Sequence, residues 1–192
     1  NGWDSRNPNA GYDDLRATLY TTETGILDIL SAFAAELFSN NALVAIFAFS
    51  LGFALGIPTA ILLAYNGVVF GSFYAVFVSQ GLGYELTGWL FIHGVTELYA
   101  IFLAGAAGFI IGGAVAFPGK QSRLAALRSA GARAGPVITG AVIMLFIAAL
   151  IESFGRELIT SDQIRYIFAG TTLVFWLSYF YIPRRFAGGR DA

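Results

Sequence analysis

Residues 37–84 read LFSNNALVAIFAFSLGFALGIPTAILLAYNGVVFGSFYAVFVSQGLGY, and none of them carries a charge. A helix that crosses the hydrocarbon core of a bilayer needs about 20 mostly apolar residues, so this stretch has room for two crossings. The whole chain of 192 residues has the same character, because 57% of it is hydrophobic and only 12% is charged. Soluble domains carry about 25% charged residues. We therefore expect an all-α fold, a polytopic transmembrane helical bundle.

The remaining charge-free stretches bring the expected number of spans to about five. Long runs rich in Leu, Ile, Phe and Ala, without strict alternation, favour helices over the strands of a membrane barrel. Within residues 37–84, the pair Asn66-Gly67 is the expected break, because Asn and Gly favour turns. Pro58 is expected to kink the first span. The predicted spans are Leu43–Ala64, Val68–Tyr84, Thr96–Phe117, Gly135–Glu152 and Ile164–Ile182.

Two further segments are apolar without being predicted spans. Apolar residues recur at helical spacing from Ile26 to Phe38, which predicts an N-terminal amphipathic helix on the outer membrane surface or against the bundle. Leu86–Ile92 is too short to cross and is expected to form a short re-entrant or interfacial segment. The chain thus divides into an extracytoplasmic or interfacial segment (residues 1–39), a transmembrane domain (40–183) and a cytoplasmic basic tail (184–192).

Basic residues predict the orientation. The segment between two spans from Pro118 to Gly135 contains no acid, and the tail is also rich in arginine. Because Lys and Arg accumulate on the cytoplasmic side of a membrane, both segments should lie on the cytoplasmic side of the cell membrane, with the N-terminal segment on the outer side. The basic segment also predicts a surface for anionic lipids or for a partner protein. Its residues are Lys120, Arg123, Arg128 and Arg133.

The sequence contains few features that would indicate an enzyme. The chain has no Cys and a single His, and it lacks the Gly-x-Ser-x-Gly motif of serine hydrolases and any glycine-rich phosphate-binding motif. A formal net charge of −1 offers no basic footprint for nucleic acid. We therefore expect a protein that is not an enzyme, that binds no cofactor and that does not bind nucleic acid.

The most informative polar feature is the pair His93 and Glu97. Four residues separate them, so they share one face of a helix. Ionisable groups inside membranes are functional candidates. The pair fits a proton or ion relay, half of a metal site, or a structural contact that fixes helix register. Since no second acid cluster at ligand spacing accompanies this single His, the sequence predicts no metal site.

Small residues recur at the GxxxG spacing that lets membrane helices approach closely. Such faces suit either packing within one chain or a homo-oligomer. The candidate helix-packing residues are Gly52, Gly56, Gly67, Gly71, Ala104, Gly108 and Gly112.

Several sequence motifs form one pattern when they are taken together. They are HGVTELYAIFLAGAAG at residues 93–108, AALIESF at 148–154, and the pairs Asn40-Asn41, Asn66-Gly67 and Pro118-Gly119. The pattern resembles the stage II sporulation protein M family of integral membrane proteins, over roughly residues 38–154. The resemblance marks these family-motif positions: Asn40, Asn41, Asn66, Gly67, His93, Gly94, Glu97, Gly105, Gly108, Pro118, Gly119, Arg123 and Glu152.

The resemblance implies a non-enzymatic prokaryotic membrane scaffold or assembly factor. The family's namesake holds cell-wall hydrolases together in sporulating bacteria, and relatives occur in bacteria and archaea that form no spores. The expected partners are membrane lipids and other membrane or extracytoplasmic proteins, including cell-wall enzymes. Deleting Asn1–Glu23 is expected to weaken partner capture and to leave insertion intact. The alternative is a small transporter or channel subunit with His93 and Glu97 as a proton or ion relay.

Overall fold

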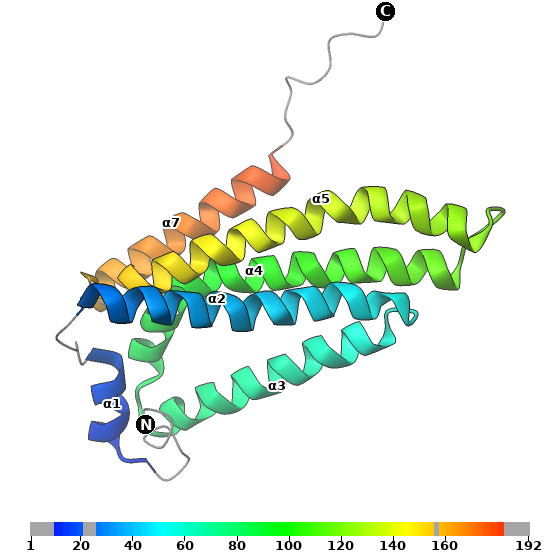
Figure 1. The fold of residues 1–192 in the computed structure, drawn as a ribbon. Coiled ribbons are helices and arrows are strands. Elements are labelled where there is room, and N and C mark those ends of the chain that lie inside the picture. Colours follow the sequence, from blue (N-terminus) through cyan, green and yellow to red (C-terminus); the bar gives the residue numbers. More distant parts are fainter. Residues whose placement is uncertain (1–9, 21–25, 156–157, 183–192) are drawn as a thin grey trace, which may run out of the picture.

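The computed structural model describes residues 10–20, 26–155 and 158–182, without the side chains of residues 20 and 26–37. All elements in this part of the chain are helical, which confirms the all-α prediction (Figure 1). In chain order they are α1 (Tyr12–Tyr20), α2 (Ile26–Ser50), η2 (Leu51–Phe53), α3 (Ile57–Ser79), α4 (Gly83–Ala116), α5 (Arg123–Leu150), η3 (Ile151–Gly155) and α7 (Asp162–Tyr181).

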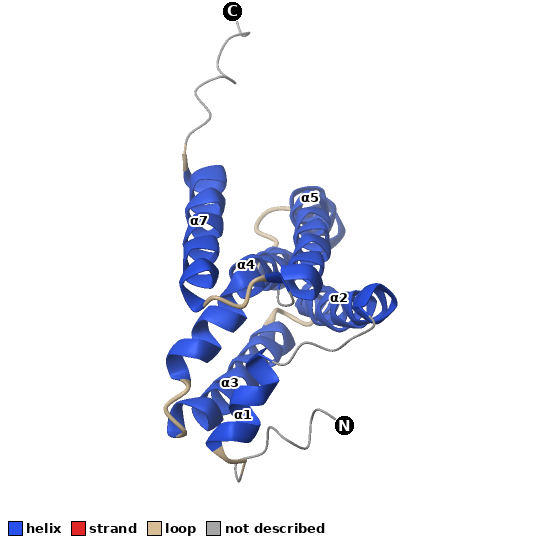
Figure 2. Ribbon diagram, turned by 90° about the vertical axis from the view of Figure 1, so that its left-hand side faces the viewer, coloured by secondary structure: helices blue, strands red, loops and turns tan. Residues whose placement is uncertain are grey.

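Helix α4 is the centre of the arrangement. Helices α2 and α5 run alongside it, α7 packs on its first half, and α3 diverges from the others (Figures 1 and 2). Small buried residues line the contacts, among them Ala45 of α2, Ala100 and Ala104 of α4, and Ala141 of α5. Because lipid tails give apolar helices no hydrophobic reason to associate, close contact between small residues is what holds such helices together.

The break in the first long apolar stretch lies at residues 51–56, and the predicted break at Asn66-Gly67 is wrong. Leu55 and Gly56 adopt left-handed backbone conformations, with φ of 62° and 76°. Asn66 lies inside α3, where its side-chain amide donates a hydrogen bond of 2.8 Å to the carbonyl of Leu62. Because the Asn66 amide has a hydrogen-bond partner within the helix, it does not favour a turn at this position. Pro58 sits in the first turn of α3, where its missing N–H is tolerated, so it does not kink a span.

The expected re-entrant segment at Leu86–Ile92 is also wrong, because these residues form the first turns of the continuous helix α4. Leu86 and Trp89 are buried in a cluster with Phe77 of α3 and with Leu15 and Leu19 of α1. The apolar character of this short segment therefore reflects packing against α1 and the end of α3. Helix α1 lies across that end of the bundle (Figure 1).

The expected amphipathic segment from Ile26 to Phe38 is not a separate helix. It is the first half of α2, which continues through Ser50 and so crosses the expected domain boundary at residues 39 and 40. The side chains of residues 26–37, and thus the proposed amphipathic face, lie outside the described residues, as does the tail at 184–192. The basic segment is largely helical, since α5 begins at Arg123 with the Ser122 hydroxyl accepting from the Ala125 N–H.

Three helices in the described part of the chain are long and apolar enough to cross a membrane. They are Ile57–Ser79, Gly83–Ala116 and Arg123–Gly155, and Phe38–Phe53 is a shorter apolar helix. Helix α3 exposes many large apolar side chains, such as Ile61 and Val68, as a helix facing lipid would. The structure thus supports a membrane protein, while the prediction of about five spans is not confirmed.

Candidate functional site

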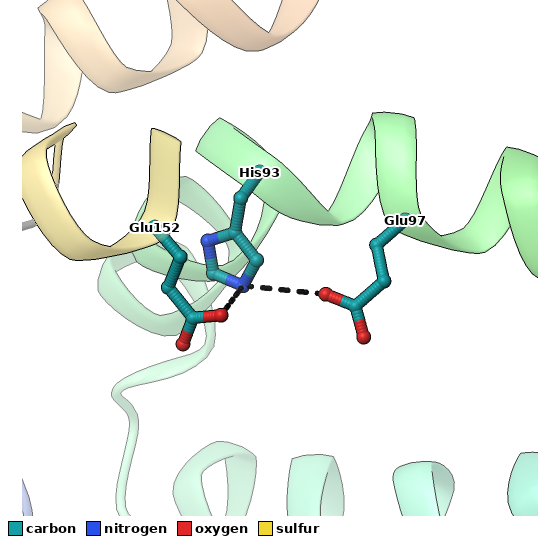
Figure 3. A group of neighbouring side chains, drawn as sticks. All are labelled: His93, Glu97 and Glu152. Carbon is teal, nitrogen blue, oxygen red and sulfur yellow. Dashed lines mark ion pairs between the residues drawn. The ribbon is translucent and has the colours of Figure 1, made fainter. Parts of the chain in front are cut away.

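Three ionisable side chains meet inside the bundle. His93 and Glu97 lie one turn apart on α4, and Glu152 reaches them from η3 (Figure 3). The Nε2 atom of His93 lies 3.5 Å from a carboxylate oxygen of Glu152 and 3.9 Å from one of Glu97. One ligand atom from each of the three residues lies within 4.8 Å of the other two. His93 is placed between the two carboxylates (Figure 3).

Glu152 reaches the cluster from a π-helical turn, Ile151–Gly155, at the end of α5. Both Glu152 and its neighbour Ser153 are buried there. Such turns are rare, and they occur frequently at functional sites. Upstream of the turn, α5 packs closely along α4, with Ala141 and Leu145 buried against Ala104 and its neighbours. This packing sets the distance between Glu152 and the α4 residues.

The cluster is largely shielded from solvent. His93 is 4% exposed, Glu152 is 6% exposed, and the Glu97 side chain is 19% exposed. Burying a charge costs several kcal/mol unless an opposite charge or a ligand compensates it. Two ionised carboxylates beside one imidazolium would leave an uncompensated negative charge. The arrangement therefore favours the presence of a further cation or proton between these side chains.

Aromatic residues from two helices contact His93 and the residue that precedes Glu97. The Trp89 ring meets the His93 ring edge-on, with ring centroids 6.1 Å apart. Trp176 of α7 donates a 3.0 Å hydrogen bond from its indole N–H to the hydroxyl of Thr96, which directly precedes Glu97. Rigid neighbours of this kind hold functional side chains in a fixed orientation.

The sequence identified the pair on α4 but did not connect it to Glu152. The helical spacing of four residues was sufficient to bring His93 and Glu97 together. Glu152 was marked only as a family-motif position, and nothing in its local sequence indicates which helix it faces. The prediction of no metal site rested on the lack of a further acid near the pair, and the structure places one there.

The candidate packing glycines fall into two groups. A Cβ on Gly52 of η2 would overlap the backbone carbonyl of Gly108 on α4, and one on Gly112 would lie 2.6 Å from the backbone nitrogen of Gly56. Ala104 is fully buried on the same helix. A Cβ on Gly67 or Gly71, by contrast, would meet no atom within 4 Å. The first group forms a close crossing of the η2 region over α4, and the second lies on the exposed face of α3.

The remaining motif positions lie outside the cluster. Asn40 is exposed and Asn41 half-buried within α2, while Gly94 and Gly105 are buried on α4. The basic residues Lys120, Arg123 and Arg128 are exposed. Arg133 lines an open pocket of about 420 Å³ between the ends of α4 and α5, together with Phe117, Pro118 and Gln121. This combination of one basic and several apolar groups is compatible with a lipid headgroup and chain.

Arg165 was not among the residues predicted from the sequence, although it lies within the predicted span Ile164–Ile182. Its side chain is 1% exposed. It donates to the carbonyl of Ile159 at 2.8 Å, to the carboxylate of Asp162 at 3.2 Å and to the carbonyl of Leu19 at 3.3 Å. The last contact joins α7 to the end of α1. An Arg among apolar residues was the available signal, because such a residue needs buried acceptors.

Comparison with known proteins places these features in one family. The family model described as stage II sporulation protein M matches residues 7–155, a range that includes the His93–Glu97–Glu152 cluster and the glycine crossing. No curated protein and no solved structure matches the chain. Since the family model covers well over half of the sequence, the chain belongs to the stage II sporulation protein M family.

Proposed function

We propose that this protein is a non-enzymatic scaffold or assembly factor that organises partner proteins at the cytoplasmic membrane. The observation that carries the proposal is the position of α1. Its residues Leu15 and Leu19 are buried against the bundle, while Asp13, Asp14 and Arg16 are exposed on its other side. A charged helical surface held at a fixed place at one end of a membrane bundle is suited to binding an extracytoplasmic partner.

The proposed topology has five crossings, by α2, α3, α4, α5 and α7. The turn between α2 and α3 and the loop between α4 and α5 lie at one end of the bundle, and α1 lies at the other end (Figure 1). The end with the two connections carries Lys120 and Arg123. These basic residues favour a cytoplasmic location for that end and an outer location for α1. These crossings differ from the predicted spans mainly in the break at residues 51–56.

The first prediction tests the outer surface of α1. Deleting Asn1–Glu23 would also remove Leu15 and Leu19, so a reversal of the two exposed acids is the cleaner change. Asp13→Lys with Asp14→Lys should reduce recovery of extracytoplasmic partners about fivefold to tenfold, because reversing exposed charges turns attraction into repulsion. The measurement is quantitative mass spectrometry of proteins that co-purify from native membranes.

Gln163→Lys is the matched control, since Gln163 is exposed at the start of α7 and lies outside α1. This variant adds positive charge elsewhere on the molecule and should recover the same partners as the wild type. Equal partner recovery by the wild type and the double variant would contradict a role for the α1 surface.

The second candidate function is a small transporter or channel subunit. The observation that favours it is the meeting of three ionisable groups, two of them buried, within helices that can cross a membrane. Chains of such groups occur in proton relays and ion pathways. In this alternative, Glu97, the most exposed of the three, would connect the buried pair to water.

The second prediction separates the two functions. If the protein is a scaffold, proteoliposomes containing it should show no proton or cation flux above that of empty vesicles. Glu97→Gln should then change the yield of partner complexes or the stability without changing flux. Flux in the wild type that is lost in Glu97→Gln and kept in Glu85→Gln would favour the transporter. Fluorescent pH and ion indicators trapped in the vesicles provide the measurement.

A further inference from the structure

The distances within the His93–Glu97–Glu152 cluster are too long for strong hydrogen bonds. Charge-assisted N–H···O bonds are about 2.7–2.9 Å long. The two contacts of the His93 Nε2 atom measure 3.5 Å and 3.9 Å. In a tetrahedral site with metal–ligand bonds of about 2.0–2.2 Å, the ligand atoms lie about 3.4 Å apart. The two observed distances are therefore closer to the distance between two ligands of one metal ion than to the length of a charge-assisted hydrogen bond.

The charge of the cluster is compatible with a bound divalent cation. A neutral imidazole and two carboxylates carry a charge of −2, which a divalent cation balances. Protonation of the imidazole alone would leave one negative charge in a cluster of which His93 and Glu152 are buried. Within an apolar bundle, a neutral assembly is far less costly than a charged one.

The donor set indicates the class of ion. Calcium takes six to eight oxygen ligands, and magnesium prefers octahedral oxygen coordination with several waters. One imidazole and two carboxylates suit zinc and similar divalent transition metals, which accept mixed nitrogen and oxygen ligands. Three protein ligands also leave a fourth position for water or another small ligand.

We propose that His93, Glu97 and Glu152 bind one divalent transition-metal ion of the zinc class, which joins α4 to the η3 end of α5. The Glu97 side chain is the most exposed of the three, so the ion would enter from its side of the cluster. Modest side-chain rotations bring the three ligand atoms, which already lie within 4.8 Å of one another, around one ion. This site is independent of the scaffold function proposed above.

The test uses the full chain in detergent with a histidine-free affinity tag. After incubation with zinc and removal of the unbound ion, elemental analysis should find one zinc per chain. Glu152→Gln keeps the size of the side chain and should weaken zinc binding by more than about 100-fold, since even supporting residues around a metal contribute 10- to 100-fold. Glu85→Gln, two turns earlier on α4, should bind zinc like the wild type.

A second measurement uses the wild type alone, so it does not depend on a variant that folds. Because the chain contains one His, any imidazole coupling in the electron paramagnetic resonance spectrum of bound Cu²⁺ must come from His93. Zinc should displace Cu²⁺ and remove that signal. A zinc content no higher than that of the buffer, equal zinc binding by wild type and Glu152→Gln, or a Cu²⁺ spectrum without imidazole coupling would each overturn the proposal.

Discussion

Gly108→Ala is expected to lower the free energy of unfolding by about 2–3 kcal/mol, although it adds a single methyl group. A Cβ at this position would overlap the backbone carbonyl of Ala48. Backbone atoms cannot rotate away as a flexible side chain can, so α2 and α4 must separate. Separation would also weaken the contact of Gly52 with Gly108 and that of Gly112 with Gly56, because all four glycines belong to one crossing.

The matched change on α3 should have the opposite sign. Gly67 and Gly71 lie within a helix, and an added Cβ meets no atom within 4 Å at either position. Alanine is favoured over glycine in a helix by about 0.5–1 kcal/mol, so Gly67→Ala should leave the stability unchanged or raise it. Reversible unfolding in mixed detergent micelles, followed by circular dichroism, compares the variants.

Equal destabilisation by Gly108→Ala and Gly67→Ala would contradict the crossing seen in the structure. It would also indicate that the Gly67–Gly71 face is packed in the assembled protein, for example against a second copy of the chain. Cross-linking of the purified protein, before and after each substitution, distinguishes that outcome from a general effect of removing glycine.

The fold class was predictable because it depends on composition and run length, while the helix boundaries depend on tertiary contacts. The pair Asn66-Gly67 favours a turn by local preference, but Asn66 satisfies its amide within α3 and Gly67 lies on an exposed face. The actual break follows Gly52, where the close crossing over Gly108 fixes the chain and a left-handed Gly56 redirects it. The GxxxG spacing predicts that such glycines pack against a helix, but it does not indicate which helix or that the crossing ends one.

The same reasoning explains how much of the site could be predicted. His93 and Glu97 are neighbours by helical geometry alone, and the spacing of four residues identifies them. Glu152 joins them only because α5 returns along α4 and a π-helical turn re-aims its last residues. Neither the pairing of these helices nor the turn has a clear sequence signal.

Helix α4 contacts its neighbouring helices in two different ways along its length, through a crossing of glycines and through a polar cluster. Its 34 residues span about 51 Å, well beyond the roughly 30 Å of a hydrocarbon core. The glycine crossing occupies the second half, where apolar residues need only close packing. The polar cluster occupies the first half, nearer to α1 and to the proposed outer surface. The excess length thus lets one helix hold both a close contact between glycines and a polar site.

Arg165→Met is expected to lower the free energy of unfolding by about 3 kcal/mol, because buried acceptors lose a charged donor. Arg165 donates to the carbonyls of Ile159 and Leu19 and to the carboxylate of Asp162. Methionine replaces its volume but none of these hydrogen bonds. Since the bond to Leu19 fastens α1 to α7, the backbone amides of Tyr12–Tyr20 should exchange with solvent deuterium faster than in the wild type.

Two further variants distinguish the causes of that loss. Arg165→Lys keeps the charge but lacks the planar fork of donors, so it should restore only part of the stability and of the α1 protection. Arg123→Met removes an exposed arginine and should change the stability by less than about 0.5 kcal/mol. If α1 in Arg165→Met exchanges as slowly as in the wild type, the apolar contacts of Leu15 and Leu19 alone hold it in place. In that case, the partner-binding surface proposed for α1 depends on the hydrophobic cluster beneath it and not on the arginine.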